Sequence, residues 1–227
     1  MTQALAAPPV TPGATRLAAV VLIVAPILEM AAMAHHPSIS SHDVTEVAKQ
    51  LRALAALSAE VHGALIALLF AALLAVMQFA RGRGLARGSV SCGLMLYAAG
   101  VILMTPAGLV DGFIVPRVTL AVPGMAPADP ALVAQFAAFA MLFNQAFAKC
   151  GAVLTSAGIA AFSLDLVRGV LPERVLGFFG LASGLACALA VGTGALPLNL
   201  HGMSLVLWLQ ALWMIGAGAL LLRAVRP

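Results

Sequence analysis

Charged residues are scarce in this chain of 227 residues, because Asp, Glu, Lys and Arg together make up only 9% of it. An ordinary soluble domain carries about a quarter charged residues, which cover its surface. A chain that is 63% hydrophobic cannot build such a surface, so the composition excludes an ordinary soluble domain. A membrane bundle needs no polar cover because lipid surrounds it, and the mean hydropathy of +1.07 favours that class.

Cysteines are also few, and no familiar catalytic motif is present. Cys92, Cys150 and Cys187 lie in or beside apolar runs without CxxC spacing, which indicates small core residues rather than a disulfide framework. The net charge of +4 comes from clusters at the ends of apolar runs, and no basic stripe alternates with aromatic residues. We therefore expect no nucleic-acid partner. The chain has no HExxH, phosphate-binding loop or nucleophile elbow that would name an enzyme family.

Six stretches reach the roughly 20 apolar residues that a membrane-spanning helix needs. They cover approximately 17–34, 59–80, 90–110, 144–167, 175–196 and 202–222. The sequence predicts an all-α polytopic membrane bundle, a single membrane domain over 1–227 with an N-terminal tail at 1–16. The first stretch could instead be a signal peptide, because Arg16 precedes it and Ala32-Met33-Ala34 resembles a cleavage site. Glu29 inside the apolar run favours a spanning helix.

The positive residues predict the orientation of the bundle. With the N-terminus in the cytoplasm, most of the 12 Lys and Arg residues fall on the inner side, as the positive-inside rule expects. The inner set is Arg16, Arg81, Arg83, Arg87, Arg168, Arg174, Arg223 and Arg226, and the outer set is Lys49, Arg52, Arg117 and Lys149. We therefore expect a multi-pass protein of the plasma (inner) membrane with both termini cytoplasmic.

Two outer segments predict short amphipathic helices that lie on the outer membrane surface. One follows Asp43, which forms a plausible capping box with Glu46. The other follows Asp129 and carries an aromatic stripe, typical of packing, at Phe136, Phe139, Phe143 and Phe147. With these segments, 17–82 and 90–169 form a weak parallel repeat of helix, surface helix and helix. A C-terminal helical hairpin at 175–223 completes the chain.

The polar residues of the bundle gather at its predicted outer end. All five histidines fall there, namely His35, His36, His42, His62 and His201. Most acidic residues join them, whereas the inner side keeps only Asp165 and Glu173. Polar side chains are costly in lipid, so this segregation predicts that any functional site faces the periplasm or another extracytoplasmic space.

One hypothesis is a metal or haem site at this outer end. His36 (or His35), His62 and His201 would converge between three helices, with Glu29 beneath them. Imidazoles with a carboxylate or thioether suit copper, zinc or iron, and two histidines on facing helices could clamp a haem. The alternative is that each histidine only bonds water, headgroups or a backbone carbonyl, and that Glu29 forms a structural ion pair.

Asp111 and Lys149 are further candidates for this site. Asp111 lies where the third spanning helix leaves the membrane, so it is either a turn former or a ligand at the same mouth. Lys149 would pair with Glu29, line the pocket, or simply extend its charge to the headgroups.

Three functions follow from this outer site. The first is a metal- or haem-dependent oxidoreductase acting on a hydrophobic small molecule such as a lipid or a quinone, with Glu29 tuning the site or relaying protons. The second is a transporter or ligand-binding protein that uses the same pocket. The third is an accessory subunit, because small residues would permit tight helix contacts within the chain, or between chains in a homo-oligomer or larger membrane complex. They are Gly180, Gly184, Gly192, Gly194, Gly216 and Gly218.

Overall fold

The computed structural model describes residues 11–37, 41, 43–119 and 129–224, and this part of the chain contains helices but no strand. Six of the helices are long and apolar enough to span a membrane. They are α1 (Pro12–Ala34), α2 (Val44–Arg83), α3 (Gly88–Leu109), α4 (Pro130–Leu166), α5 (Leu171–Thr193) and α6 (Leu200–Ala224). A π-helical turn, η1 (Val110–Ile114), and a 3-10 turn, η2 (Pro116–Thr119), continue α3. This is the architecture of a multi-pass membrane protein, as the apolar runs predict.

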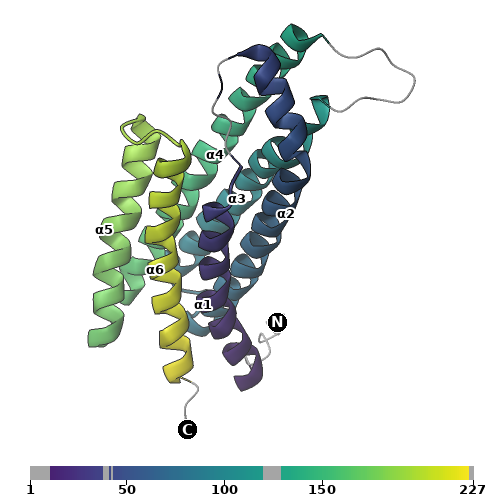
Figure 1. Cartoon of the computed structure of the whole chain (residues 1–227). Coiled ribbons are helices and arrows are strands. Elements are labelled where there is room, and N and C mark those ends of the chain that lie inside the picture. Colours follow the sequence, from purple (N-terminus) through teal and green to yellow (C-terminus); the bar gives the residue numbers. More distant parts are fainter. Residues whose placement is uncertain (1–10, 38–40, 42, 120–128, 225–227) are drawn as a thin grey trace, which may run out of the picture.

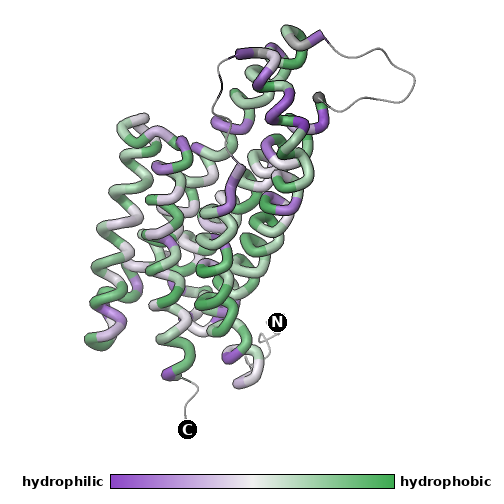
Figure 2. Tube along the Cα trace, viewed as in Figure 1, coloured by the Kyte–Doolittle hydropathy of each residue, from purple (hydrophilic) through white to green (hydrophobic). Residues whose placement is uncertain are grey.

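The first helix begins and the last helix ends at the same end of the bundle (Figure 1), which we call the terminal end. We call the opposite end, where α1 ends and α2 begins, the histidine end. Hydrophobic residues dominate the helices between the two ends (Figure 2). Such an apolar exterior is what a lipid surround requires.

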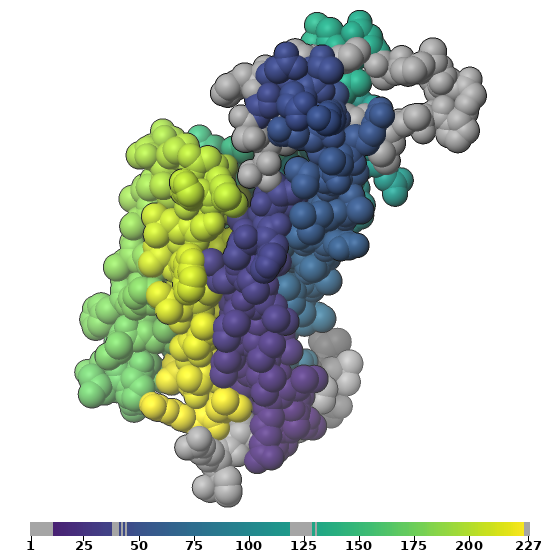
Figure 3. Space-filling model, viewed as in Figure 1, coloured from purple at the N-terminus to yellow at the C-terminus, as the bar shows by residue number. Residues whose placement is uncertain are grey.

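Two helices are much longer than a membrane is thick. The 40 residues of α2 and 37 of α4 correspond to about 60 and 55 Å at 1.5 Å per residue, against a hydrocarbon core of roughly 30 Å. Both helices project together beyond α1, α5 and α6 at the histidine end (Figures 1 and 3). The two predicted surface helices are thus not separate elements, because each is the first part of a long continuous helix.

The projecting parts of α2 and α4 pack on each other and on the end of α3. Leu51 of α2 is buried with Val115, Ala137 and Ala140. Asp43 caps α2 by accepting a hydrogen bond from the backbone of Glu46, as the capping box predicts. The aromatic stripe on α4 does not pack inward, since Phe136, Phe139 and Phe143 are all exposed.

Glycines bring the helix backbones close together. A Cβ added to Gly100 of α3 would lie 2.6 Å from the backbone nitrogen of Thr155 on α4, and one added to Gly158 would lie 2.8 Å from that of Tyr97. Most of the C-terminal glycines also face neighbouring helices of the same chain, namely Gly180, Gly184, Gly216 and Gly218. Gly194 instead ends α5 with a positive φ of 81°. These contacts lie within the chain, one of the two roles the sequence leaves open.

Buried aromatic rings and ion pairs hold the terminal half of the bundle together. The rings of Phe79, Phe162 and Trp213 contact one another with centroid separations of 5.8 to 6.0 Å, and all three are buried. Below them, Arg83 pairs with Asp165 at 2.6 Å and with Glu173 at 2.5 Å. Together these contacts join α2, α4, α5 and α6 in the terminal half of the bundle.

Candidate metal centre and apolar cavity

The end of α1 sends two adjacent histidines in different directions. The helix stops at Ala34, and Pro37 cannot continue it. His35 is exposed, and its Nδ1 lies 2.9 Å from the carbonyl oxygen of Ala31. The His36 side chain turns inward and is only 20% exposed. His36 is therefore the one of the pair that enters the bundle.

His62 lies on the inner face of α2 and is only 5% exposed. Its Nδ1 donates a hydrogen bond to the carbonyl oxygen of Ser58, one turn earlier, at 2.8 Å. The hydroxyl of Ser58 in turn donates to the carbonyl oxygen of Asp111 at 3.2 Å. The neighbouring Glu60 is exposed, as expected for a residue two positions from a buried one on a helix. Ser58 thus orients the imidazole and ties α2 to the end of α3.

Asp111 sits in the π-helical turn η1, where the regular hydrogen bonding of α3 changes. π-helical turns often occur at functional sites because they redirect side chains. The next residue, Gly112, packs directly on His62: an added Cβ would lie 2.4 Å from the His62 Cβ. The absence of a side chain at Gly112 therefore allows α3 to approach His62 closely enough for the Asp111 carboxylate to reach its imidazole.

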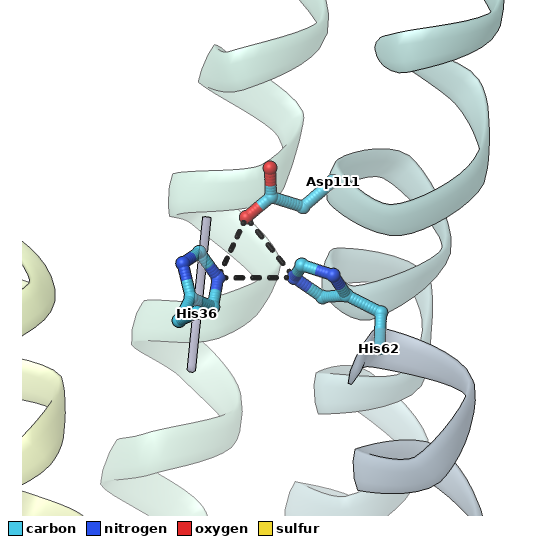
Figure 4. A group of neighbouring side chains, drawn as sticks. All are labelled: His36, His62 and Asp111. Carbon is cyan, nitrogen blue, oxygen red and sulfur yellow. Dashed lines mark hydrogen bonds and ion pairs between the residues drawn. The ribbon is translucent and has the colours of Figure 1, made fainter. Parts of the chain in front are cut away.

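His36, His62 and Asp111 direct one ligand atom each toward a common point (Figure 4). The two Nε2 atoms of the histidines lie 3.2 Å apart. The Asp111 Oδ2 lies 3.6 Å from Nε2 of His36 and 3.3 Å from Nε2 of His62. We call these three residues the His-Asp cluster. They come from α2, from η1 and from the chain just after α1, so tertiary packing alone assembles them.

The dimensions of the His-Asp cluster fit a transition-metal ion. Metal–ligand bonds to imidazole nitrogen and carboxylate oxygen are about 2.0 to 2.2 Å long. A point about 2.1 Å from all three atoms exists just outside their plane, where they subtend angles of about 100° to 120°. Three protein ligands near tetrahedral angles leave a fourth position for water or a substrate, as in catalytic zinc sites. Two histidines and one carboxylate also suit non-haem iron.

The hydrogen bonding around His62 favours a proton or a metal ion within the cluster. Because Nδ1 donates to Ser58, Nε2 of a neutral His62 carries a lone pair. Oδ2 of Asp111, also an acceptor, lies 3.3 Å from that nitrogen. Two acceptors repel at such a distance unless a proton or a metal ion lies between them. The Ser58 carbonyl is the outer-shell acceptor that metal-bound histidines typically have.

The same geometry does not favour a haem. In a bis-histidine haem the two nitrogens lie about 4 Å apart on opposite sides of a flat macrocycle, at bond lengths near 2.0 Å. Here Nε2 of His36 and Nε2 of His62 are 3.2 Å apart, with ring centroids at 4.9 Å and a third ligand beside them. No macrocycle can pass between these rings, so a single ion fits better.

The His-Asp cluster lines a cavity of about 540 Å³. The cavity starts between the projecting parts of α2 and α4, at Leu51 and Ala137, and reaches down to Thr155 and Gln210. Most of its wall is apolar, with Leu65, Ile66, Leu69, Leu207 and four methionines, Met33, Met104, Met141 and Met203. A concave, mostly apolar site with a few convergent polar groups is typical of small-molecule binding.

Glu29 lines the same cavity below the cluster and is only 3% exposed. It shares this wall with Met33 and His36, as their spacing of four and three residues along the chain predicts. Its Oε1 has no hydrogen-bond partner among the described residues. The carboxyl group therefore faces the cavity and is not held in an ion pair with another described residue.

Other predicted site residues lie elsewhere. His201 and Lys149 are exposed, and neither lines the cavity, so His201 does not complete the cluster and Lys149 does not pair with Glu29. His201 stands at the second position of α6, whereas Asn199 and Leu200 beside it face the cavity. His35 points outward as well, and His42 lies outside the described residues. The sequence leaves Asp111 open as a turn former or a ligand, and the structure makes it the third member of the His-Asp cluster.

Sequence reasoning missed two residues that position the cluster, Ser58 and Gly112. Ser58 precedes His62 by one helical turn and therefore shares its face, a signal that was available. The role of Gly112 depends on how closely α3 approaches α2, which no local pattern reveals.

Comparisons of this chain with protein-family models, with curated proteins and with solved structures find no match.

Proposed function

We propose that this protein is a membrane-bound, metal-dependent oxidoreductase that acts on a hydrophobic, lipid-soluble substrate held in the cavity. The observation that carries the proposal is the convergence of His36, His62 and Asp111 at 3.2 to 3.6 Å on the wall of an apolar cavity. Two neutral imidazoles and a carboxylate would bind one divalent ion. Iron is the redox-active metal that this donor set suits best.

The substrate would reach the site from the outer part of the bilayer. The positive-inside rule supports both termini in the cytoplasm, and the histidine end would then face the periplasmic or extracytoplasmic side. The cavity would accept the apolar part of a lipid or a quinone between its leucines and methionines. The open coordination position of the ion would then meet the polar end of the molecule.

The cavity supports an enzyme better than a transporter. Its described lining ends at Thr155 and Gln210 and includes none of the arginines at the terminal end. Trp213, Phe79 and Phe162 fill the bundle between. A transporter would need a second opening through this packed layer.

Metal analysis of matched variants tests the proposal. The protein is purified in mild detergent, reconstituted with Fe²⁺ or Zn²⁺, passed over a desalting column and analysed by mass spectrometry. We expect about one ion per chain in the wild type and less than a tenth of that in His62→Ala and Asp111→Asn. His35→Ala and His201→Ala should keep the wild-type content, because both side chains are exposed and outside the cluster.

The metal also decides the class of reaction. Retention of iron, or of copper, by protein isolated from its native membrane would support redox chemistry. Zinc alone would contradict the oxidoreductase and leave hydrolysis as the chemistry of the same ligands. Wild-type protein that binds no ion under any of these conditions would refute the metal centre.

A further inference from the structure

The deep half of the cavity contains the carboxyl group of Glu29, one oxygen of which lacks a hydrogen-bond partner among the described residues. Glu29 is 3% exposed, lies well inside α1, and has an oxygen without any hydrogen bond among the described residues. An ionisable group at such a depth is expensive unless it is paired, and such groups typically mark functional sites. The cavity is the open space beside it, so a ligand is the natural source of the partner.

The floor of the cavity offers a free hydrogen-bond acceptor. The side-chain nitrogen of Gln210 donates to Thr155 Oγ1 at 2.9 Å and to Ser156 Oγ at 3.0 Å, which leaves the Gln210 carbonyl oxygen for other partners. Both Gln210 and Thr155 line the cavity near its floor. The described lining contains two carboxylates, Glu29 and Asp111, and neither Lys nor Arg. A ligand that donates hydrogen bonds and carries positive charge complements this wall.

The distance between Glu29 and the His-Asp cluster sets the length of the ligand. Glu29 precedes His36 by seven residues, which corresponds to about 10 Å at the rise of an α-helix. Met33, Leu65 and Met104 line the cavity together with them and make its wall apolar. A chain of roughly eight methylene groups would cover that distance, with one polar end near the His-Asp cluster and the other near Glu29.

We infer that the deep half of the cavity binds the ammonium group of an alkylamine, with the Glu29 carboxylate as its counter-ion and the Gln210 carbonyl oxygen as a second acceptor. The natural ligand is then an amphiphile with an amine at the end of an apolar chain. This deepens the proposed function by naming the substrate class, and it rests on that function only for the metal-facing end. The ammonium site itself needs no metal.

Two probes of equal length test the inference. Binding of n-octylamine and of 1-octanol is measured at neutral pH on detergent-purified full-length protein by native mass spectrometry and by the shift in melting temperature. A charge-assisted hydrogen bond is worth about 1.5 to 3 kcal/mol, so octylamine should bind at least about tenfold more tightly than octanol. Glu29→Gln should abolish this difference and leave octanol binding unchanged.

A matched control is Glu60→Gln, which changes an exposed glutamate at the same end of the bundle. It should retain the wild-type preference for octylamine. Equal affinities of the two probes for the wild type, or an unchanged preference in Glu29→Gln, would overturn the inference. If Glu29→Gln fails to fold, equal affinities of the two probes for the wild type still overturn the inference.

His62→Ala separates this inference from the proposed function. Because His62 belongs to the cluster and not to the deep end, the variant should lose the ion and keep the preference for octylamine. A wild type that binds octylamine through Glu29 but never binds metal would refute the metal centre and support the ammonium site. A wild type that binds metal but shows no preference for octylamine would support the metal centre and refute the ammonium site.

Discussion

The orientation of one imidazole, that of His62, determines what the cluster can bind. Its Nδ1 is committed to the Ser58 carbonyl oxygen, so Nε2 faces His36 and Asp111 as a lone-pair donor. This is how metal-bound histidines are commonly held, with the second nitrogen fixed by a backbone or carboxylate oxygen. The side chain is therefore preorganised by its own helix before any ligand arrives.

Gly112→Ala should weaken metal binding at least about tenfold, which is the usual range for loss of outer-shell support. The new Cβ would lie 2.4 Å from the His62 Cβ, so either η1 or the imidazole must move. Gly63→Ala is the matched control, because its Cβ would meet Phe113 at an ordinary 3.5 Å. Metal titration followed by mass spectrometry measures both, and equal affinities in the two variants would contradict the positioning role of Gly112.

For single residues, the sequence predicts well which side chains share one face of a helix. It predicts poorly which side chains from different helices come into contact. Helical spacing correctly groups Glu29, Met33 and His36 on one wall and separates His62 from Glu60. It cannot tell that His201 at the start of α6 stays outside, because that depends on the path of the chain between α5 and α6. It likewise leaves Asp111 ambiguous, since the π-helical turn has no local signal in this segment.

At the scale of elements, α2 and α4 carry the architecture of the histidine end. Both continue past α1, α5 and α6 (Figure 1), and they pack on the end of the α3 segment through Leu51, Val115 and Ala140. The sequence predicts a break between the surface segment and the spanning segment of α2, but no Pro or Gly interrupts residues 44–62. The absence of a helix breaker there was a usable sign of one continuous helix.

The close contact of α3 and α4 should be sensitive to a single methyl group. Gly100→Ala places a Cβ 2.6 Å from the backbone nitrogen of Thr155, and overpacking of this kind costs about 1 to 3 kcal/mol. Gly82→Ala is the control, because nothing lies within 4 Å of its added Cβ. Thermal unfolding in detergent should show a lower melting temperature for Gly100→Ala only. An unchanged melting temperature would contradict the close packing of α3 on α4.

At the scale of the whole molecule, composition and apolar runs predict the class of fold, and the six long apolar helices confirm it. They cannot predict that α2 and α4 extend beyond α1, α5 and α6 at the histidine end (Figure 1), because that follows from which helices pack side by side. The cavity arises at this end, so its volume and its dead end at Gln210 are properties of tertiary packing alone.

The predicted orientation of the molecule is testable with single cysteines. In a background where the three native cysteines are replaced by serine, Lys49→Cys should react in intact cells with a membrane-impermeant maleimide. Arg174→Cys should react only after the cells are opened. Both parent side chains are exposed, at the histidine end and the terminal end respectively. The reverse pattern would place the cluster on the cytoplasmic side.

X-ray absorption spectroscopy at the edge of the bound metal tests the His-Asp cluster most directly. We expect two imidazole ligands and one or two additional oxygen ligands at about 2.0 to 2.2 Å in the wild type. Asp111→Asn or His62→Ala should remove this first coordination shell, whereas His201→Ala should leave it unchanged. A spectrum without imidazole scattering, or one that His201→Ala alters and His62→Ala does not, would contradict the metal centre at His36, His62 and Asp111.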